Sequence, residues 1–261
     1  MPLQLIDTHC HLDHEPLASA VEAVLERARA AGVVQCVSIG TTLETSRANV
    51  ALARRHPSAV RAAIGIHPHE ADTVTDSLLD ELAALACEPG VVAIGEVGLD
   101  YYRQHATPAN QEHVFCYCIA LAQRTNLPLL MHCRDAYEPL LALLRRDTQP
   151  PLRGIIHCAS GPPEFIREAL AMGLHISFAG NVTFPNAHAL RALVPLVPDD
   201  RLLVETDAPW LAPQPVRGQP NEPAYVAHTA AHLAQLRGAT IEAVGACTSR
   251  NARQLFGLPE T

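Results

Sequence analysis

Two histidines separated by one residue follow an apolar run near the start of the chain, in the segment Leu5-Ile6-Asp7-Thr8-His9-Cys10-His11. Alternate residues of a β-strand project to the same face of a sheet, so a strand here would point His9 and His11 together and Cys10 away from them. Two neighbouring imidazoles can bind one metal ion. The same pair could also be structural, with one ring bonded to a backbone carbonyl. The pair by itself leaves both roles open.

Further side chains of metal-ligand and acid–base type stand at the ends of later apolar runs. They occur in Gly65-Ile66-His67-Pro68-His69, Gly95-Glu96-Val97-Gly98-Leu99-Asp100, His132-Cys133-Arg134-Asp135, His157 and Glu205-Thr206-Asp207-Ala208-Pro209. Each residue alone has an ordinary explanation as a capping, hydrogen-bonded or solvated side chain. A structural explanation of the whole set must place such residues at most of the strand ends by accident. Their shared position is the strongest functional signal in the sequence.

The apolar runs alternate with amphipathic segments along the chain, which predicts strands joined by helices. Expected strands cover residues 3–8, 35–39, 60–66, 91–96, 127–132, 154–157, 174–177 and 202–206. Expected helices cover residues 18–31, 43–55, 78–86, 111–124, 137–146, 163–172, 187–193, 225–236 and 241–255.

Eight strand–helix units in series predict an α/β fold, a TIM (β/α)8 barrel that forms a single domain over residues 1–261. A doubly wound open sheet is the alternative, but that fold normally carries a glycine fingerprint after its first strand, where this chain has His-Cys-His. The carboxyl ends of barrel strands share one mouth. We therefore expect six side chains to converge there: His9, His11, Glu96, His132, His157 and Asp207.

The composition limits the partners of this protein. The chain has 261 residues, 48% of them hydrophobic, and a formal net charge of -8. An acidic protein is not expected to bind long duplex nucleic acid through a broad basic surface, so any phosphate contact must be local. The eight cysteines form no CxxC pair and are expected to be reduced core residues. No signal peptide, membrane span or obligate protein partner is evident, which favours a cytoplasmic enzyme.

The two carboxylates of the set suit hydrolysis. Glu96 could span two cations about 3.5–4 Å apart, and a water held by such ions can have its pKa lowered towards about 7. Asp207 could orient that water and accept its proton. Asp207 could instead cap the following turn, and Glu205 alternates onto the same face of the strand, so spacing alone does not choose between these two residues.

Two further residues are candidates for binding the substrate. Arg134 could form a bidentate pair with phosphate oxygens, or a salt bridge to Asp135 or Glu138. His67 precedes a proline, which favours an extended or turned loop, so this histidine could line the mouth or support the loop beneath it.

Several segments of the chain together resemble the TatD family of metal-dependent hydrolases, within the amidohydrolase superfamily. They are residues 6–13, 65–69 and 94–102, Gln111, Phe115, and residues 132–134, 157–161, 205–209 and 217–223, in the family's order and over nearly the whole chain.

The resemblance implies a TIM barrel that holds one or two divalent metal ions and acts on phosphate esters, typically described as a deoxyribonuclease. His9 and His11 would bind one metal, Glu96 would bridge to a second held by His132 and His157, and Asp207 would complete the first site and contact the hydrolytic water. Mixed nitrogen and oxygen donors suit zinc, manganese or magnesium.

Three positions depart from the family pattern. Ala159 stands where a bulky aromatic is usual, Trp210 replaces a smaller aromatic, and Gln219-Pro220 replaces basic residues. The first two change the shape of the pocket, and the third removes positive charge near a phosphate path. The sequence predicts a divalent-metal-dependent phosphodiesterase or deoxyribonuclease whose substrate is a phosphate ester such as a DNA end. The alternatives are a metal-dependent amidase, lactonase or carboxylic esterase on the same barrel, and a non-enzymatic, metal-stabilised binding protein.

Overall fold

Every strand of the sheet lies parallel to its neighbours, in the order in which the strands follow along the chain. The computed structural model describes residues 3–259. The strands are β1 (Leu5–Cys10), β2 (Val33–Ile39), β3 (Val60–Ile64), β4 (Val91–Asp100), β5 (Leu129–Arg134), β6 (Gly154–Ile156), β7 (His175–Phe178) and β8 (Leu202–Val204). The two edges of the sheet meet where the Asp207 amide donates to the His9 carbonyl over 2.8 Å and the His11 amide to the Ala208 carbonyl over 2.8 Å. The predicted single (β/α)8 barrel is confirmed.

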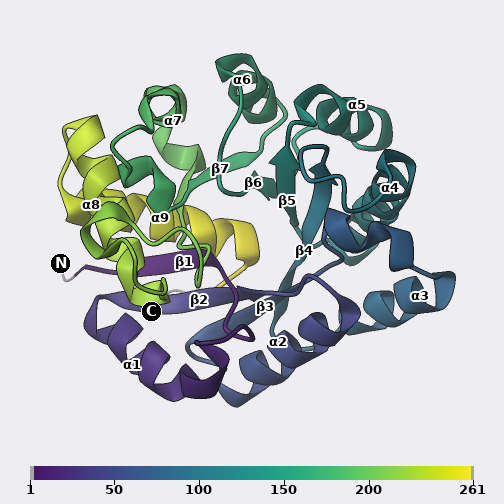
Figure 1. Cartoon of the computed structure of the whole chain (residues 1–261), viewed down its shortest axis with the longest axis horizontal. Coiled ribbons are helices and arrows are strands. Elements are labelled where there is room, and N and C mark those ends of the chain that lie inside the picture. The colour runs from purple at the N-terminus through teal and green to yellow at the C-terminus, as the bar shows by residue number, and fades with distance from the viewer. Residues whose placement is uncertain (1–2, 260–261) are drawn as a thin grey trace.

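Helices surround the strands (Figure 1). They are α1 (Val21–Ala30), α2 (Leu43–Arg55), α3 (Asp76–Leu85), α4 (Pro108–Thr125), α5 (Tyr137–Asp147), α6 (Pro163–Ala171), α7 (His188–Leu193), α8 (Val226–Arg237) and α9 (Ile241–Phe256). Short 3-10 turns lie between several of them. No helix among residues 3–259 is both long and apolar enough to cross a membrane.

The barrel interior is filled by one inward-facing cluster of apolar side chains. Its members come from nearly every strand, from α9 and from the residues just after it: Ile6, Val37, Ile39, Ala63, Val92, Ala93, Leu130, Ile155, Leu203, Ala252, Leu255, Phe256 and Leu258. A larger apolar layer packs between the strands and the outer helices, because strands of a parallel barrel are covered on both faces. Asn251 of α9 donates to the carbonyls of Asp199 and Leu202 and so fixes this helix at the amino end of β8.

Three strands extend further towards the mouth than the sequence predicts. β1 reaches Cys10, β4 reaches Asp100 and β5 reaches Arg134, where the expected ends are residues 8, 96 and 132. Pairing between β4 and β5 continues through Gly98 beside His132 and through Asp100 beside Arg134. Gly98 has a φ of +137°, and a Cβ there would lie 2.0 Å from the His132 carbonyl oxygen, so this close approach requires glycine. His9, Glu96 and His132 therefore project from rigid strands.

The cysteines are only partly as expected. All eight are free, and Cys10, Cys36, Cys118 and Cys133 are buried. Cys87 is exposed, so the expectation that all eight are core residues is wrong. Cys87 follows the end of α3 at the surface, where nothing requires an apolar side chain to be covered.

Candidate metal centre

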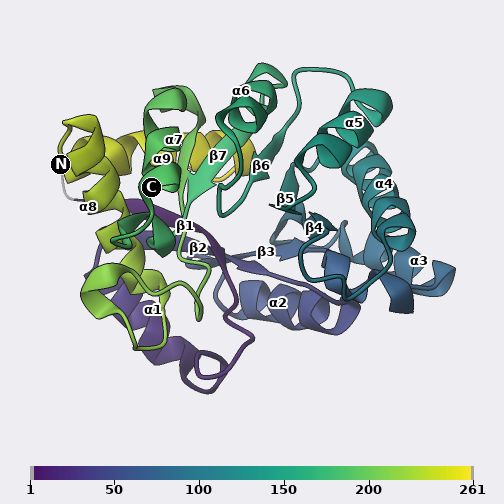
Figure 2. The same cartoon turned by 45° about the horizontal axis from the view of Figure 1, so that its top comes forward.

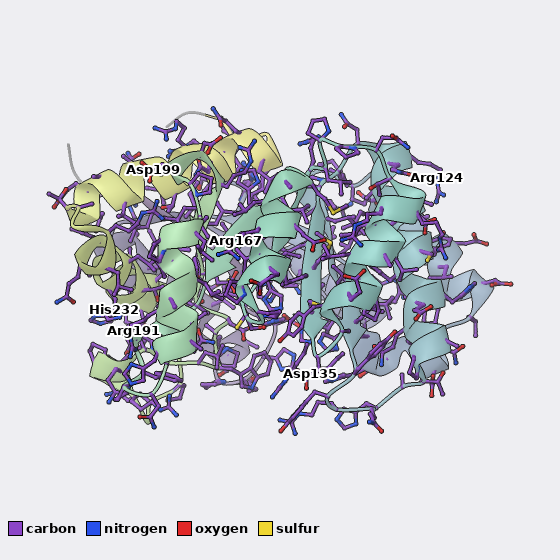
Figure 3. The ribbon with its side chains drawn as sticks, turned by 90° about the horizontal axis from the view of Figure 1, so that it is seen from above. Arg124, Asp135, Arg167, Arg191, Asp199 and His232 are labelled. Atoms are coloured by element: carbon purple, nitrogen blue, oxygen red, sulfur yellow. The ribbon has the colours of Figure 1, made fainter. Side chains whose placement is uncertain are left out.

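A cavity of about 800 Å³ opens where the strands end and the following loops begin. Its lining includes five of the six expected metal ligands, namely His11, Glu96, His132, His157 and Asp207. His9 lies beneath them, fully buried. In Figure 3 this end of the barrel is at the bottom, where Asp135 follows β5, and the opposite end, with Asp199 and Arg124, is at the top.

The Glu96 carboxylate lies between two pairs of histidines. Its Oε1 is 2.9 Å from His157 Nε2 and 3.0 Å from His132 Nδ1. Its Oε2 is 3.5 Å from His9 Nε2 and 3.9 Å from His11 Nε2. Each oxygen of one carboxylate thus faces a different pair of imidazoles, which is the arrangement that a carboxylate bridging two cations requires.

The first histidine pair converges on one point. His9 Nε2 and His11 Nε2 are 3.1 Å apart, and Asp207 Oδ1 is 3.6 Å from each. His11 follows the last residue of β1, and its ring still converges with that of His9, as the sequence predicts. His11 Nδ1 lies 3.2 Å from the Ile39 carbonyl, which directs Nε2 into the cluster. One half of the centre therefore comprises His9, His11, Asp207 and Glu96 Oε2, and the other comprises His132, His157 and Glu96 Oε1.

The charges of these groups fit a cation. Burial would raise the pKa of Glu96, but the facing His157 and His67 hold it well below the usual range. Burial likewise opposes ionisation of Asp207, yet its hydrogen bond to His11 and its closeness to His9 lower its pKa. Burial lowers the pKa of His9, which favours a neutral ring. Against burial, the facing carboxylates raise the pKa of His11, His132 and His157, so a bound cation would displace protons from these three rings. Ionised carboxylates and neutral imidazoles are the forms that bind metals.

The donor set also fits a metal in its chemistry. Groups of three potential ligand atoms lie within 4.8 Å of one another on both sides of Glu96: His9, His11 and Glu96 on one side, and His67, Glu96 and His132 on the other. Mixed nitrogen and oxygen donors suit divalent ions of the first transition row.

Two further acids hold the second histidine pair in place. Asp100 Oδ2 lies 3.1 Å from His132 Nε2 and 2.9 Å from His69 Nε2. Glu205 is fully buried, and its Oε1 accepts from the Cys158 amide over 2.6 Å and lies 3.4 Å from His157 Nδ1. Asp207 and Glu205, which spacing alone could not separate, therefore face different parts of the cluster.

The two expected substrate-binding residues have different surroundings. His67 lies in the cluster, with Nε2 3.5 Å from Glu96 Oε1, and burial lowers its pKa to about 3. Arg134 lines the cavity, and its guanidinium lies 4.0 Å from the centre of the Tyr102 ring. It forms no salt bridge to any residue from 3 to 259, and Glu138 pairs instead with Arg145. The alternative of a local salt bridge for Arg134 is therefore wrong, because the guanidinium stacks on the tyrosine.

Sequence reasoning omitted several residues at the mouth. Tyr102, which ends the segment 94–102 that carries the resemblance, is 55% exposed. The ring lies two residues after Asp100, whose register partner is Arg134, and this pairing of β4 with β5 is not evident from the sequence. His69 belongs to the segment 65–69, which the sequence already indicates. Its contact with Asp100, the acid that also faces His132, is visible only in the structure.

Comparisons with known proteins agree with this geometry. A family model described as TatD related DNase matches residues 6–257. The chain is 40% identical to an uncharacterized metal-dependent hydrolase, YabD, of Bacillus subtilis, over 97% of this chain and 98% of that protein. It is 41% identical to the 3'-5' ssDNA/RNA exonuclease TatD of Cronobacter turicensis, over 95% and 94% of the two chains. The solved structure of YJJV, a TatD homolog from Escherichia coli, superposes with a TM-score of 0.93 at 32% identity, covering 99% of this chain and 100% of that one.

Proposed function

Because this chain belongs to the TatD-related DNase family of metal-dependent hydrolases, we propose that it hydrolyses phosphodiester bonds at the ends of nucleic-acid strands. The observation that carries the proposal is the position of Glu96, whose two oxygens face two separate histidine pairs. Related proteins named as exonucleases acting on single-stranded DNA and RNA support the choice of substrate.

In this proposal the two halves of the centre hold two divalent ions, zinc, manganese or magnesium. His9, His11, Asp207 and Glu96 hold one, and Glu96, His132 and His157 hold the other. Such ions lower the pKa of a coordinated water and stabilise the attacking and leaving oxygens of a phosphoryl displacement. Two bound cations would also balance the negative charge of the carboxylates and accept the lone pairs of the ring nitrogens that face Glu96.

The side chains of the cavity supply the remaining functions. Asp207 lies at the cavity surface with Oδ1 directed towards the first histidine pair, where it orients the attacking water and accepts its proton. Arg134 has no carboxylate partner among the described residues and lines the cavity, so its guanidinium can bind the phosphate. His67 accepts at Nδ1 from the His69 amide, which leaves Nε2 protonated and able to donate to a substrate oxygen.

The test is hydrolysis of matched substrates by the metal-loaded protein. End-labelled single-stranded DNA, a chromogenic phosphodiester, a carboxylic ester, a lactone and an amide would be compared across zinc, manganese and magnesium. We expect turnover of the two phosphodiesters and a loss of about 10²–10⁴-fold in Asp207→Asn. Glu96→Ala should lose both activity and bound metal while keeping the wild-type circular dichroism spectrum.

Asp199→Asn is the matched control, because Asp199 lies at the opposite end of the barrel and pairs with Arg237 (Figure 3). Turnover of the ester, lactone or amide without turnover of either phosphodiester would overturn the substrate assignment. Full activity in Asp207→Asn would overturn the role of that residue. Elemental analysis of the purified protein would measure the identity and number of the ions directly.

A further inference from the structure

Two aromatic side chains lie open to solvent at the mouth of the barrel. Tyr102 is 55% exposed and Trp210 is 48% exposed, whereas large apolar side chains are otherwise mostly buried in residues 3–259. Tyr102 follows β4 and Trp210 follows β8. Since the strands are arranged in chain order in a ring of eight, β4 and β8 lie opposite each other, and the two rings stand on opposite sides of the mouth.

The Trp210 ring is held beside the metal centre. It makes edge-to-face contacts with His11, at a centroid distance of 5.0 Å, and with His14, at 5.1 Å. Its backbone is fixed as well, because its amide donates to the Asp207 carbonyl over 2.9 Å and its carbonyl accepts from Asn221 Nδ2 over 2.6 Å. Trp210 thus presents an exposed ring that is held in place and directly contacts His11, a proposed metal ligand.

Two arginine side chains lie beside the Tyr102 ring. The Arg134 guanidinium lies 4.0 Å from the ring centre and the Arg103 guanidinium 5.6 Å from it. Both arginines line the cavity, and neither has a carboxylate partner among the described residues. Asp100 Oδ1 accepts from the amides of Tyr102 and Arg103, so the acid that orients His132 also fixes this turn. The Tyr102 ring is therefore connected to the metal centre through Asp100, and the two arginines beside it can bind phosphate.

Electrostatics alone provide little affinity for a polyanion here. The chain carries a formal net charge of -8, and Glu70 and Asp135 stand in the cavity wall with the two arginines. Exposed aromatic rings bind nucleic acid in another way, by stacking on bases, which every base permits. Bases inside a duplex are already stacked on one another, so only unpaired bases can reach such rings.

We propose that Trp210 and the Tyr102–Arg134 pair are two base-stacking platforms on opposite sides of the mouth, which select unpaired nucleotides and position the phosphate between them over the metal centre. The proposal rests on the phosphodiesterase function and adds to it the residues that recognise the unpaired bases of a single-stranded or frayed end. Binding depends on the bases more than on the backbone. With about two arginine–phosphate contacts, the affinity should fall with salt at a logarithmic slope of only about -1.4.

Trp210 is the one tryptophan in the sequence, so its fluorescence reports directly on this platform. The binding test uses Asp207→Asn, which prevents turnover, with a short labelled thymidine oligonucleotide and an abasic oligonucleotide of equal length. We expect the thymidine strand to quench the tryptophan emission. We also expect it to bind at least about five-fold more tightly than the abasic strand, as measured by fluorescence anisotropy.

Platform variants made in the same Asp207→Asn background separate stacking from charge. Trp210→Ala and Tyr102→Ala should each weaken binding of the thymidine strand about five-fold or more and leave the abasic strand little affected. Trp210→Phe should restore most of the affinity. Leu236→Ala, which removes an exposed apolar side chain of α8, is the control for Trp210→Ala.

Arg134→Ala also has a matched control. Arg124 likewise stacks on a tyrosine, Tyr117, at 5.6 Å, but it lies at the opposite end of the barrel (Figure 3). Arg134→Ala should weaken both oligonucleotides and flatten the salt dependence, whereas Arg124→Ala should change neither.

Equal affinity for the thymidine and abasic strands, or a platform variant that binds like its parent, would overturn the stacking proposal. Blunt duplex binding as tight as that of the single strand would do the same. These results leave the proposed function intact if the wild-type protein still hydrolyses phosphodiesters. A wild-type protein that hydrolyses no phosphodiester contradicts the proposed function itself, whatever the binding assays show.

Discussion

Glu205 Oε1 lies 3.4 Å from His157 Nδ1, while the other nitrogen of that ring, Nε2, lies 2.9 Å from Glu96 Oε1. The buried glutamate and the central glutamate thus stand on opposite sides of one imidazole. A negative charge that faces Nδ1 of an imidazole favours the tautomer with the proton on Nδ1, which leaves Nε2 free to bind a metal. The Cys158 amide, which donates to the same Oε1 over 2.6 Å, holds Glu205 in place.

Glu205→Gln tests this relationship, because the amide oxygen can still accept from the Cys158 amide while the negative charge facing His157 is lost. We expect the affinity for the ion at the His132–His157 half to fall about 10- to 100-fold, with a smaller change at the other half. Competition with a chromogenic chelator measures both affinities. Glu164→Gln on the surface of α6 is the control, and an unchanged affinity in Glu205→Gln would show that Glu205 has only a structural role.

The division of Glu96 between two histidine pairs predicts how the ions are lost. His11→Gln should remove one ion, His132→Gln should remove the other, and Glu96→Gln should weaken both, because among residues 3–259 only the Glu96 carboxylate faces both histidine pairs. Metal content after desalting gives the stoichiometry. The melting temperature with and without a chelator measures how much a bound ion stabilises the fold. The expected gain in unfolding free energy is about 2.7 kcal/mol per site when the free metal concentration is 100 times Kd. Loss of both ions in His11→Gln would contradict two separate halves.

The barrel could be predicted from the sequence because its signal is repeated eight times. Each apolar run is short, each is followed by an amphipathic helix, and α2 coincides with the expected range of residues 43–55. The convergence of the six candidate ligands then follows from the topology, since strand ends of a parallel barrel share one mouth. Errors in single strand ends do not affect this inference.

Contacts that depend on register and on irregular backbone could not be predicted in the same way. β8 ends at Val204, so the alternation expected to place Glu205 and Asp207 on one face does not extend to them. Asp207 instead has a left-handed φ of +56°, and its amide donates to the His9 carbonyl. The stacking of Arg134 on Tyr102 likewise depends on the pairing of Asp100 with Arg134, which neither strand encodes alone.

The segment that carries Trp210 is tied to the barrel through Arg27 and Glu222. Arg27 of α1 donates from Nε and Nη2 to both oxygens of Glu222, at 2.6 to 2.9 Å. Figures 1 and 2 both show the light-green segment after β8 beside α1. Arg217 within this segment is exposed and offers a trypsin site.

Glu222→Gln should loosen this segment with little effect on the barrel. A loss of about 1 kcal/mol in local opening free energy would speed trypsin cleavage after Arg217 about five-fold, while the urea midpoint changes little. Mass spectrometry of the fragments identifies the cut. Glu81→Gln is the control, because it breaks a surface ion pair between Glu81 of α3 and Arg47 of α2. Equal cleavage rates in the wild type and Glu222→Gln would show that the ion pair does not hold the segment.

His175, at the start of β7, predicts a pH dependence of stability. Burial, with the nearby charge of Arg201, lowers the pKa of this histidine to about 4, against 6.5 for the free side chain. Between these values the unfolded chain binds a proton that the folded chain does not, so stability is complete above about pH 6.5 and falls as the pH drops towards 4.

His175→Gln removes this titratable group, so neither the folded nor the unfolded variant can bind a proton at position 175. From pH 7.5 to pH 5 the wild type should lose about 2 kcal/mol more unfolding free energy than the variant, since 1.5 pH units of the window are crossed at about 1.36 kcal/mol each. Urea unfolding at the two pH values, with chelator present, measures the difference. The two proteins differ only at position 175, so the difference isolates that histidine. Parallel losses in the two proteins would mean that His175 takes up its proton as readily in the folded barrel as in the unfolded chain.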